Sequence, residues 1–222
     1  MNRRFLNRAE AGAELAARLV AMHLEPPIVV LALPRGGVPI GVEVARALKA
    51  PLDLLLVRKI GLPWQPELAL AAVVDGTPPD IVVDEAVRRG TDIDDAYIEA
   101  QAEQELVEIR RRRSVYLRGR PPVDVESRTA VVVDDGIATG TTMRAALKAL
   151  RRRRPARLVV AVPVAPPDTI EALAGEADQI VCLEQPEPFH AVGLHYREFH
   201  QVGDDEVLAA LDGFSAATAA RT

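Results

Sequence analysis

One stretch of the chain, residues 131–147, constrains the fold more than any other. It begins with three consecutive valines, a β-branched run typical of a strand that is buried on both faces of a parallel sheet. Asp134 and Asp135 end this strand, and a loop of small residues, 136–142, leads directly into a helical pattern. Because ligands of open α/β sheets bind at the carboxyl ends of strands, both carboxylates are predicted to lie in a ligand site.

The small-residue loop (136–142) has the composition of a phosphate-binding loop. It contains two glycines and three threonines, so backbone N–H groups and hydroxyls can converge without bulky side chains. The amino end of the helix that follows favours an anion. Asp134 and Asp135 cannot hold the same anion, because like charges repel, but they suit neutral donors such as the vicinal hydroxyls of a sugar. The competing interpretation is an acidic strand end that only caps a helix.

The rest of the chain alternates between short apolar runs and segments with helical spacing. This alternation predicts an α/β fold with a doubly wound, mainly parallel sheet. Two further short strands are expected within 70–83, around a turn at 75–79. The predicted helices cover 8–22, 38–48, 92–116, 141–152, 168–174 and 204–211, and the predicted strands cover 28–33, 52–57, 129–133, 158–162 and 179–183.

Composition excludes several classes of protein. The net charge of -5 argues against sequence-independent binding of nucleic acid. Cys182 is the only cysteine, so neither an internal disulfide nor a thiolate metal cluster can form, which fits a reducing cytoplasm. No apolar run approaches membrane-spanning length, and the first residues resemble no signal peptide. We therefore expect a soluble, cytoplasmic protein without nucleic-acid or membrane partners.

The segment 131–142, VVVDDGIATGTT, resembles the signature of type I phosphoribosyltransferases that binds phosphoribosyl pyrophosphate (PRPP). Neither a GxGxxG dinucleotide loop nor a GxxxxGK[ST] loop is present. The resemblance implies that Asp134 and Asp135 are the catalytic pair and contact the ribose hydroxyls. It also implies that the 5-phosphate is held by Ala138, Thr139, Gly140, Thr141 and Thr142.

Two more segments resemble the same family. The stretch 33–41, LPRGGVPIG, is similar to its pyrophosphate loop, which implies pyrophosphate contacts from Arg35, Gly36 and Gly37 and a cis bond between Pro34 and Arg35. A simple glycine turn before a helix is the alternative. The basic pair Arg58 and Lys59 implies further pyrophosphate contacts, with solvated surface charges as the alternative.

A segment near the end, 187–196, is similar to the base-binding region of hypoxanthine-guanine-type members. The similarity implies that Phe189 stacks on the acceptor base and that Val192 reads its edge, whereas Phe189 as core filler is the alternative. Three nearby histidines are five residues apart and share no helix face, so no metal site is assigned. The arginines at 110–113, with Arg118 and Arg120, are either phosphate contacts or, as we prefer, cations that favour a helix carboxyl end.

The resemblance implies a phosphoribosyltransferase domain over 1–213, with a helical insertion or lid at 84–122 and a hood segment at 184–203. Residues 214–222 are expected to be a frayed tail. The implied reaction moves the phosphoribosyl group of PRPP to a nitrogen acceptor, a nucleobase, with Mg²⁺ held mainly by the substrate. A homodimer is expected. The alternatives are a non-catalytic sensor of PRPP or nucleotides and a phosphohydrolase of sugar phosphates.

Overall fold

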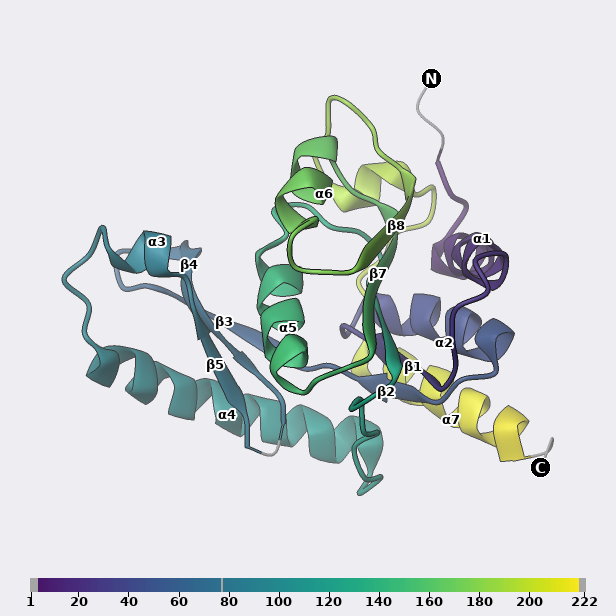
Figure 1. The fold of residues 1–222 in the computed structure, drawn as a ribbon, viewed down its shortest axis with the longest axis horizontal. Helices are drawn as coiled ribbons and strands as arrows, with labels where there is room; N and C mark the ends of the chain where they lie inside the picture. Colours follow the sequence, from purple (N-terminus) through teal and green to yellow (C-terminus); the bar gives the residue numbers. More distant parts are fainter. Residues whose placement is uncertain (1–3, 77, 220–222) are drawn as a thin grey trace.

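The computed structural model describes residues 4–76 and 78–219. Its centre is a parallel sheet of five strands in the order β2, β1, β6, β7, β8 (Figure 1). The pairings β2–β1, β1–β6, β6–β7 and β7–β8 are all parallel, as predicted. The strands are β1 (Ile28–Ala32), β2 (Leu52–Leu54), β6 (Thr129–Val133), β7 (Arg157–Val164) and β8 (Gln179–Glu184).

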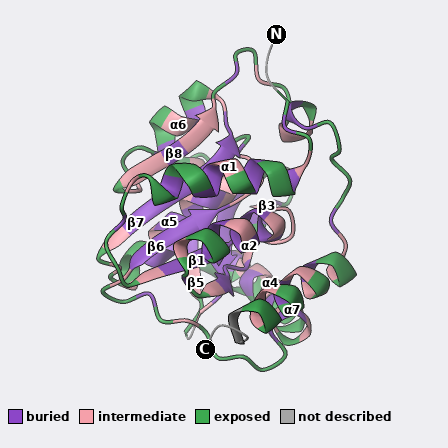
Figure 2. Cartoon of the chain, turned by 90° about the vertical axis from the view of Figure 1, so that its right-hand side faces the viewer, coloured by how far each residue is buried: buried purple, intermediate pink, exposed green. Residues whose placement is uncertain are grey.

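Helices cover both faces of this sheet, which confirms the doubly wound α/β fold. Side chains alternate along β6, so Val131 and Val133 enter one buried cluster while Ala130 and Val132 enter another. The first cluster lies under α1 (Arg8–Val20) and α2 (Gly37–Leu48), and the second under α5 (Thr141–Arg152) and α6 (Pro167–Leu173). In Figure 2 the strands are mostly buried, whereas the outer turns of α1 and α6 are exposed.

The strand order fixes where the sheet opens. From β1 the chain continues to β2 on one side, whereas β6, β7 and β8 extend the sheet on the other. The order therefore reverses between β1 and β6, which are neighbours with Ala32 opposite Val133. A crevice forms beyond the carboxyl ends of strands at such a switch point. The turn that follows Ala32 and the loop that follows Val133 both emerge there.

A second sheet departs from the sequence expectation. The strand predicted at 52–57 ends at Leu54, and Val57 begins β3 (Val57–Leu62) of a separate antiparallel sheet with β4 (Gln65–Val74) and β5 (Asp80–Val83). The two strands expected within 70–83 are present as β4 and β5, and β4 begins at Gln65, five residues before the predicted start. The short α3 (Glu85–Arg88) was not predicted, and α4 (Asp95–Leu117) packs against β3 and β4.

The last segments were only partly predicted. A short 3₁₀ turn, η1 (Val192–His195), interrupts the hood segment. The final helix, α7 (Asp204–Ala219), runs past Gly213, so the expected frayed tail is helical as far as residue 219. Its continuation has a physical reason: Phe214 packs against the core, and Arg120 donates to the Ser215 hydroxyl at 2.8 Å. Over the described residues, none of the helices combines the length and apolar character needed to span a bilayer.

Candidate functional site

The loops that carry most of the predicted site residues meet at the switch point between β1 and β6. The Leu33 N–H donates to the Val133 carbonyl at 3.0 Å, which joins the ends of the two strands. The Arg-Gly-Gly turn (34–37) then passes directly over the carboxylates that follow β6. The bond between Pro34 and Arg35 is cis, as the resemblance implied.

Close approach explains the two glycines of this turn. A Cβ added to Gly36 would overlap the carboxylate of Asp135. One added to Gly37 would lie 2.8 Å from the Val133 carbonyl oxygen, closer than real Cβ contacts. Gly36 has an ordinary right-handed conformation, with φ -59°. The turn is therefore glycine-rich because it lies against the end of β6 and the Asp135 carboxylate. It does not need a left-handed backbone at Gly36.

The two adjacent carboxyl groups lie in unequal surroundings. Burial raises the pKa of Asp134 well above the ordinary value of 3.8, and repulsion from Asp135 raises it further. Its own contact is with the Asp135 N–H, which donates to Oδ1 at 2.8 Å. Burial also raises the pKa of Asp135, but a hydrogen bond from Arg8 opposes the shift. We infer that Asp135 holds the negative charge and that Asp134 is the group that takes up a proton.

Arg8, at the start of α1, is a site residue that the sequence analysis missed. Its Nε lies 2.7 Å from Asp135 Oδ2, and its side chain is only 8% exposed. Its Nη1 donates to the His200 carbonyl at 2.9 Å, and its guanidinium lies 4.0 Å from the centre of the Phe199 ring. Arg8 therefore connects the first helix, the carboxylate pair and the hood.

A signal for Arg8 was present in the sequence. The buried side of α1 consists of Arg8, Ala11, Leu15, Ala16 and Leu19, at the spacing of one helix face. An arginine on an apolar stripe must find a buried partner, because an unpaired buried charge is strongly unfavourable. The helix pattern could thus have indicated a buried ion pair, although not its partner.

The hood reaches the backbone of Asp135 from the other side. The Tyr196 hydroxyl donates to the Asp135 carbonyl at 2.6 Å. Phe5 joins the hood to the first residues of the chain, since its N–H donates to the His195 carbonyl and its carbonyl accepts from the Arg197 N–H. Burial raises the pKa of the Tyr196 hydroxyl, which therefore stays protonated as a donor.

The small-residue loop has the geometry of an anion cradle. Gly140, the residue before α5, has φ 75°, a left-handed conformation that favours glycine, and it brings no side-chain cap to the helix. The Thr169 hydroxyl donates to the Ala138 carbonyl at 2.8 Å and holds the loop from behind. Thr139 is exposed, and its Oγ1 lies 3.3 Å from that of Thr141. Thr142 is half-buried in the first turn of α5.

Two of the predicted basic residues are paired with carboxylates. Arg35 lies 3.5 Å from Asp204 at the start of α7. Arg58 donates to Glu105 of α4 at 2.6 Å. Arg58 and Lys59 lie within β3 and do not follow a strand of the parallel sheet. Lys59 is exposed. To bind an anion, Arg35 would have to leave Asp204, and Arg58 would have to leave Glu105.

A cavity of about 730 Å³ lies between the small-residue loop and the hood, with Thr139 and Phe189 among the residues that line it. The ring of Phe189 stacks on that of His195, with centroids 5.2 Å apart and planes 17° from parallel. Val192 is outside the lining, and its side chain packs where a Cβ on Gly136 would lie, 2.6 Å from its Cγ1. The structure therefore brings Phe189, but not Val192, to the same cavity as the loop.

The arginine run of α4 consists largely of ion-paired residues. Arg111 and Arg112 both donate to Glu108, and Arg113 pairs with Asp75. Arg118 and Arg120 pair with Asp212 of α7. The expectation that these arginines favour a helix carboxyl end is wrong for 110–113, because α4 continues to Leu117 and its last turn contains no basic residue. In the described ranges, 4–76 and 78–219, no group of three or more His, Cys, Asp or Glu side chains could hold a metal ion.

Comparisons with known proteins agree with the fold. A family described as "Phosphoribosyl transferase domain" matches residues 4–197. In Mycobacterium tuberculosis, "Putative phosphoribosyl transferase Rv0571c" is 47% identical over 208 residues, which are 94% of this chain and 46% of that protein. The chain thus spans about half the length of the curated relatives it matches.

Solved structures show the same fold. TT1426 from Thermus thermophilus is 44% identical, with a TM-score of 0.83 over 95% of this chain and 99% of that one. A hypothetical protein from Neisseria gonorrhoeae with bound ppGpp is 14% identical, with a TM-score of 0.50 over 96% of this chain and 98% of the other. The second likeness concerns the fold alone.

Replacing Asp134 by asparagine is expected to stabilise the ligand-free protein near pH 8. Burial raises the pKa of Asp134 above 3.8, so the folded chain binds a proton more tightly than the unfolded chain. The free energy of unfolding therefore falls as pH rises above 3.8, and asparagine removes this loss. A melting temperature about 2–4 °C higher corresponds to ~1 kcal/mol for a chain of this size.

The pH dependence provides the check. The advantage of Asp134→Asn should shrink as pH is lowered and vanish below 3.8, where the aspartate becomes protonated in both states. The exposed Asp92→Asn variant is the control and should melt like the wild type at every pH. An Asp134→Asn variant that melts lower at pH 8 would contradict the inferred burial cost.

Gly36→Ala should destabilise the protein, because the added methyl would overlap the Asp135 carboxylate. Overpacking of this kind costs about 1–3 kcal/mol. Gly175→Ala is the matched control, since a Cβ there meets nothing within 4 Å. Urea denaturation of both variants checks the prediction, and equal midpoints would show that the turn does not press on the carboxylate.

Proposed function

The chain belongs to the phosphoribosyl transferase domain family, and we propose that it transfers the 5-phosphoribosyl group of PRPP to a nitrogen acceptor with release of pyrophosphate. The observation that carries this proposal is the meeting of a carboxylate pair, a glycine turn and an uncapped helix end at one switch point. A sugar with a phosphate at one end and a pyrophosphate at C1 needs these three kinds of contact.

The proposed roles follow from the positions of the groups. The 5-phosphate lies at the amino end of α5, where N–H groups and the hydroxyls of Thr139 and Thr142 donate to it. Asp134 and Asp135 bind the ribose hydroxyls. Arg35 leaves Asp204 to contact pyrophosphate, and the amides of the Arg-Gly-Gly turn assist. Ion pairs as exposed as this one are weak, so the exchange has a small cost.

The transfer is a substitution at C1 of the ribose. The bond from C1 to the pyrophosphate oxygen breaks, and the oxygen keeps the electron pair. The acceptor nitrogen forms the new bond and loses its proton to the released pyrophosphate. Positive charge develops on the sugar, as in glycoside cleavage. Asp135, kept ionised by Arg8, favours that charge, while a protonated Asp134 donates a hydrogen bond to a ribose oxygen.

Magnesium is proposed to arrive with the substrate. The described part of the chain offers no cluster of ligands that would hold the ion alone, whereas Asp134 and Asp135 are oxygen donors of the type that Mg²⁺ prefers. Mg²⁺ would neutralise the pyrophosphate leaving group, with these carboxylates contacting its water shell.

We propose a neutral nitrogen heterocycle, a nucleobase, as the acceptor. The cavity beside Thr139 is lined by Asp168 and Glu187 and, within the described residues, by no lysine or arginine. An acceptor with its own carboxylate would be repelled there. Phe189 offers apolar surface for a ring.

Thr139→Val should weaken PRPP binding about 10–100-fold, because a lost hydrogen bond to a charged group costs about 1.5–3 kcal/mol. Thr91→Val is the matched control, since its hydroxyl contacts only the Arg88 carbonyl, far along the chain from the loop. Calorimetric titration with PRPP and Mg²⁺ measures both. A wild-type protein that does not bind PRPP would contradict the proposal.

Turnover separates a transferase from a sensor. Incubation with PRPP and a panel of nucleobases should release pyrophosphate in amounts equal to the nucleotide formed. Tight binding of PRPP without any product would support the sensor, and release of orthophosphate without a base would support the phosphohydrolase.

Phe189→Ala should raise the Michaelis constant for the acceptor at least fivefold and leave the affinity for PRPP within twofold, because the ring lines the proposed acceptor cavity and is not part of the small-residue loop or the carboxylate pair. Phe189→Leu keeps apolar volume against the core and separates packing from ring stacking. If both variants lose only thermal stability, with the acceptor constant unchanged, Phe189 is core filler.

A further inference from the structure

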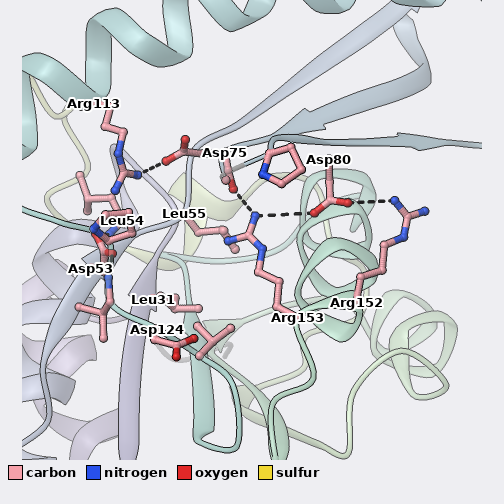
Figure 3. A pocket seen from close by; sticks show the side chains of 15 residues that line it. Leu31, Asp53, Leu54, Leu55, Asp75, Asp80, Arg113, Asp124, Arg152 and Arg153 are labelled. Atoms are coloured by element: carbon pink, nitrogen blue, oxygen red, sulfur yellow. Dashed lines mark hydrogen bonds and ion pairs between the residues drawn. The ribbon is translucent and has the colours of Figure 1, made fainter.

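A second cavity, of about 460 Å³, lies on the α5 side of the parallel sheet, away from the switch point. Leu31 and Leu55 form its floor at the edge of the sheet, and the ends of α4 and α5 and the β4–β5 turn form its walls (Figure 3). The arginines at the end of α5 lie roughly 17 Å along the helix from its first residue. No lining residue belongs to the Arg-Gly-Gly turn or the small-residue loop.

Arginines from two helices meet at this cavity. Arg113 comes from α4, whereas Arg152 and Arg153 come from the end of α5, and Figure 3 shows Arg113 and Arg153 approaching from different sides. The apolar floor and guanidinium walls together suit a ligand with an apolar body and an anionic group. The volume lies within the range of small-molecule sites.

One of these arginines has an unused donor. Arg113 Nη1 pairs with the Asp75 carboxylate. Arg113 Nη2 is buried, yet no residue in the described part of the chain accepts a hydrogen bond from it. A buried guanidinium N–H without an acceptor is costly, so an acceptor from outside the chain would stabilise the arrangement.

The acidic residues around the cavity are already occupied. Asp75 pairs with Arg113, and Asp80 pairs with Arg152 at 3.1 Å and Arg153 at 3.8 Å. Asp53 is buried, and its two oxygens accept the N–H groups of Leu54 and Val123 at 2.8 and 2.7 Å.

The remaining carboxylate, Asp124, is exposed and accepts the Glu126 N–H at 3.0 Å. All four carboxylates of the lining therefore already accept from other groups, although they outnumber its three arginines.

The turn at Gly76 is shaped for these contacts. Arg153 Nη2 donates to the Asp75 carbonyl, and a Cβ on Gly76 would overlap that guanidinium. Glycine leaves room here for the Arg153 guanidinium, and a Cβ would also lie 2.8 Å from the Pro78 carbonyl oxygen.

We propose that this cavity is a second binding site, which takes a small organic anion whose carboxylate or phosphate oxygen accepts from Arg113 Nη2 while its apolar part lies on Leu31 and Leu55. The site is separate from the proposed PRPP site and does not depend on the transfer reaction. Carboxylates and phosphates both have the required oxygen, so the test compares one ligand of each kind.

The test is calorimetric titration of the full chain with benzoate and with phenyl phosphate, which share a ring and differ in the anionic group. Arg113→Lys keeps a cation near Asp75 but removes Nη2, and it should weaken binding at least tenfold. Arg152→Met, on a side chain that is 58% exposed, should weaken binding severalfold and serves if Arg113→Lys does not fold. Melting temperatures establish that each variant is folded.

Arg154→Met is the matched control, because Arg154 is 79% exposed, pairs with Glu126 and does not line the cavity. It should change the affinity for either probe less than twofold, and so should Thr139→Val in the small-residue loop. Arginine-dependent binding of either probe supports the site, and the tighter probe identifies its anion. Absence of binding by both probes at millimolar concentration, equal loss in Arg154→Met, or binding that requires Thr139 would overturn it.

Discussion

Mutual repulsion between two buried carboxylates is the constraint on which the site depends. Asp134 and Asp135 are adjacent in the chain, so folding cannot separate them, and burial makes their repulsion stronger. Only Asp135 is paired with a buried cation, Arg8. The unequal surroundings leave one carboxyl ionised and the other ready for a proton. A pair of equal carboxylates would lack this division of roles.

Local patterns explain why the centre of the site could be predicted. The bounds of β6 and α5 agree with the sequence expectation, because the apolar run and the helical spacing are continuous on either side of the loop. The order of the strands in the sheet was not predicted. The place of the candidate site after β6 was predicted all the same, because ligand sites of this fold follow the carboxyl ends of strands. The contacts proposed for Thr139, Arg35 and the carboxylates remain predictions.

Features that depend on distant partners could not be read from the sequence. The apolar run that begins at Leu52 divides between two sheets, and its composition does not show which residues pair with β1. Arg35 and Arg58 have partners 169 and 47 residues away, so sequence spacing gave no sign of them. The prediction that residues after 213 fray was wrong as far as 219, because a contact from Arg120 holds Ser215.

The contacts of Asp135 and of its partner Arg8 also set an order for the assembly of the site during translation. Arg8 leaves the ribosome before the carboxylate does, but Tyr196 and the His200 carbonyl follow Asp135 by about 60 residues. Synthesis at about 5–20 residues per second separates these events by several seconds. A nascent chain can therefore form the sheet from β1 to β7 while the carboxylate pair is still open to water. The proposed ribose subsite would be among the last parts of the molecule to be completed.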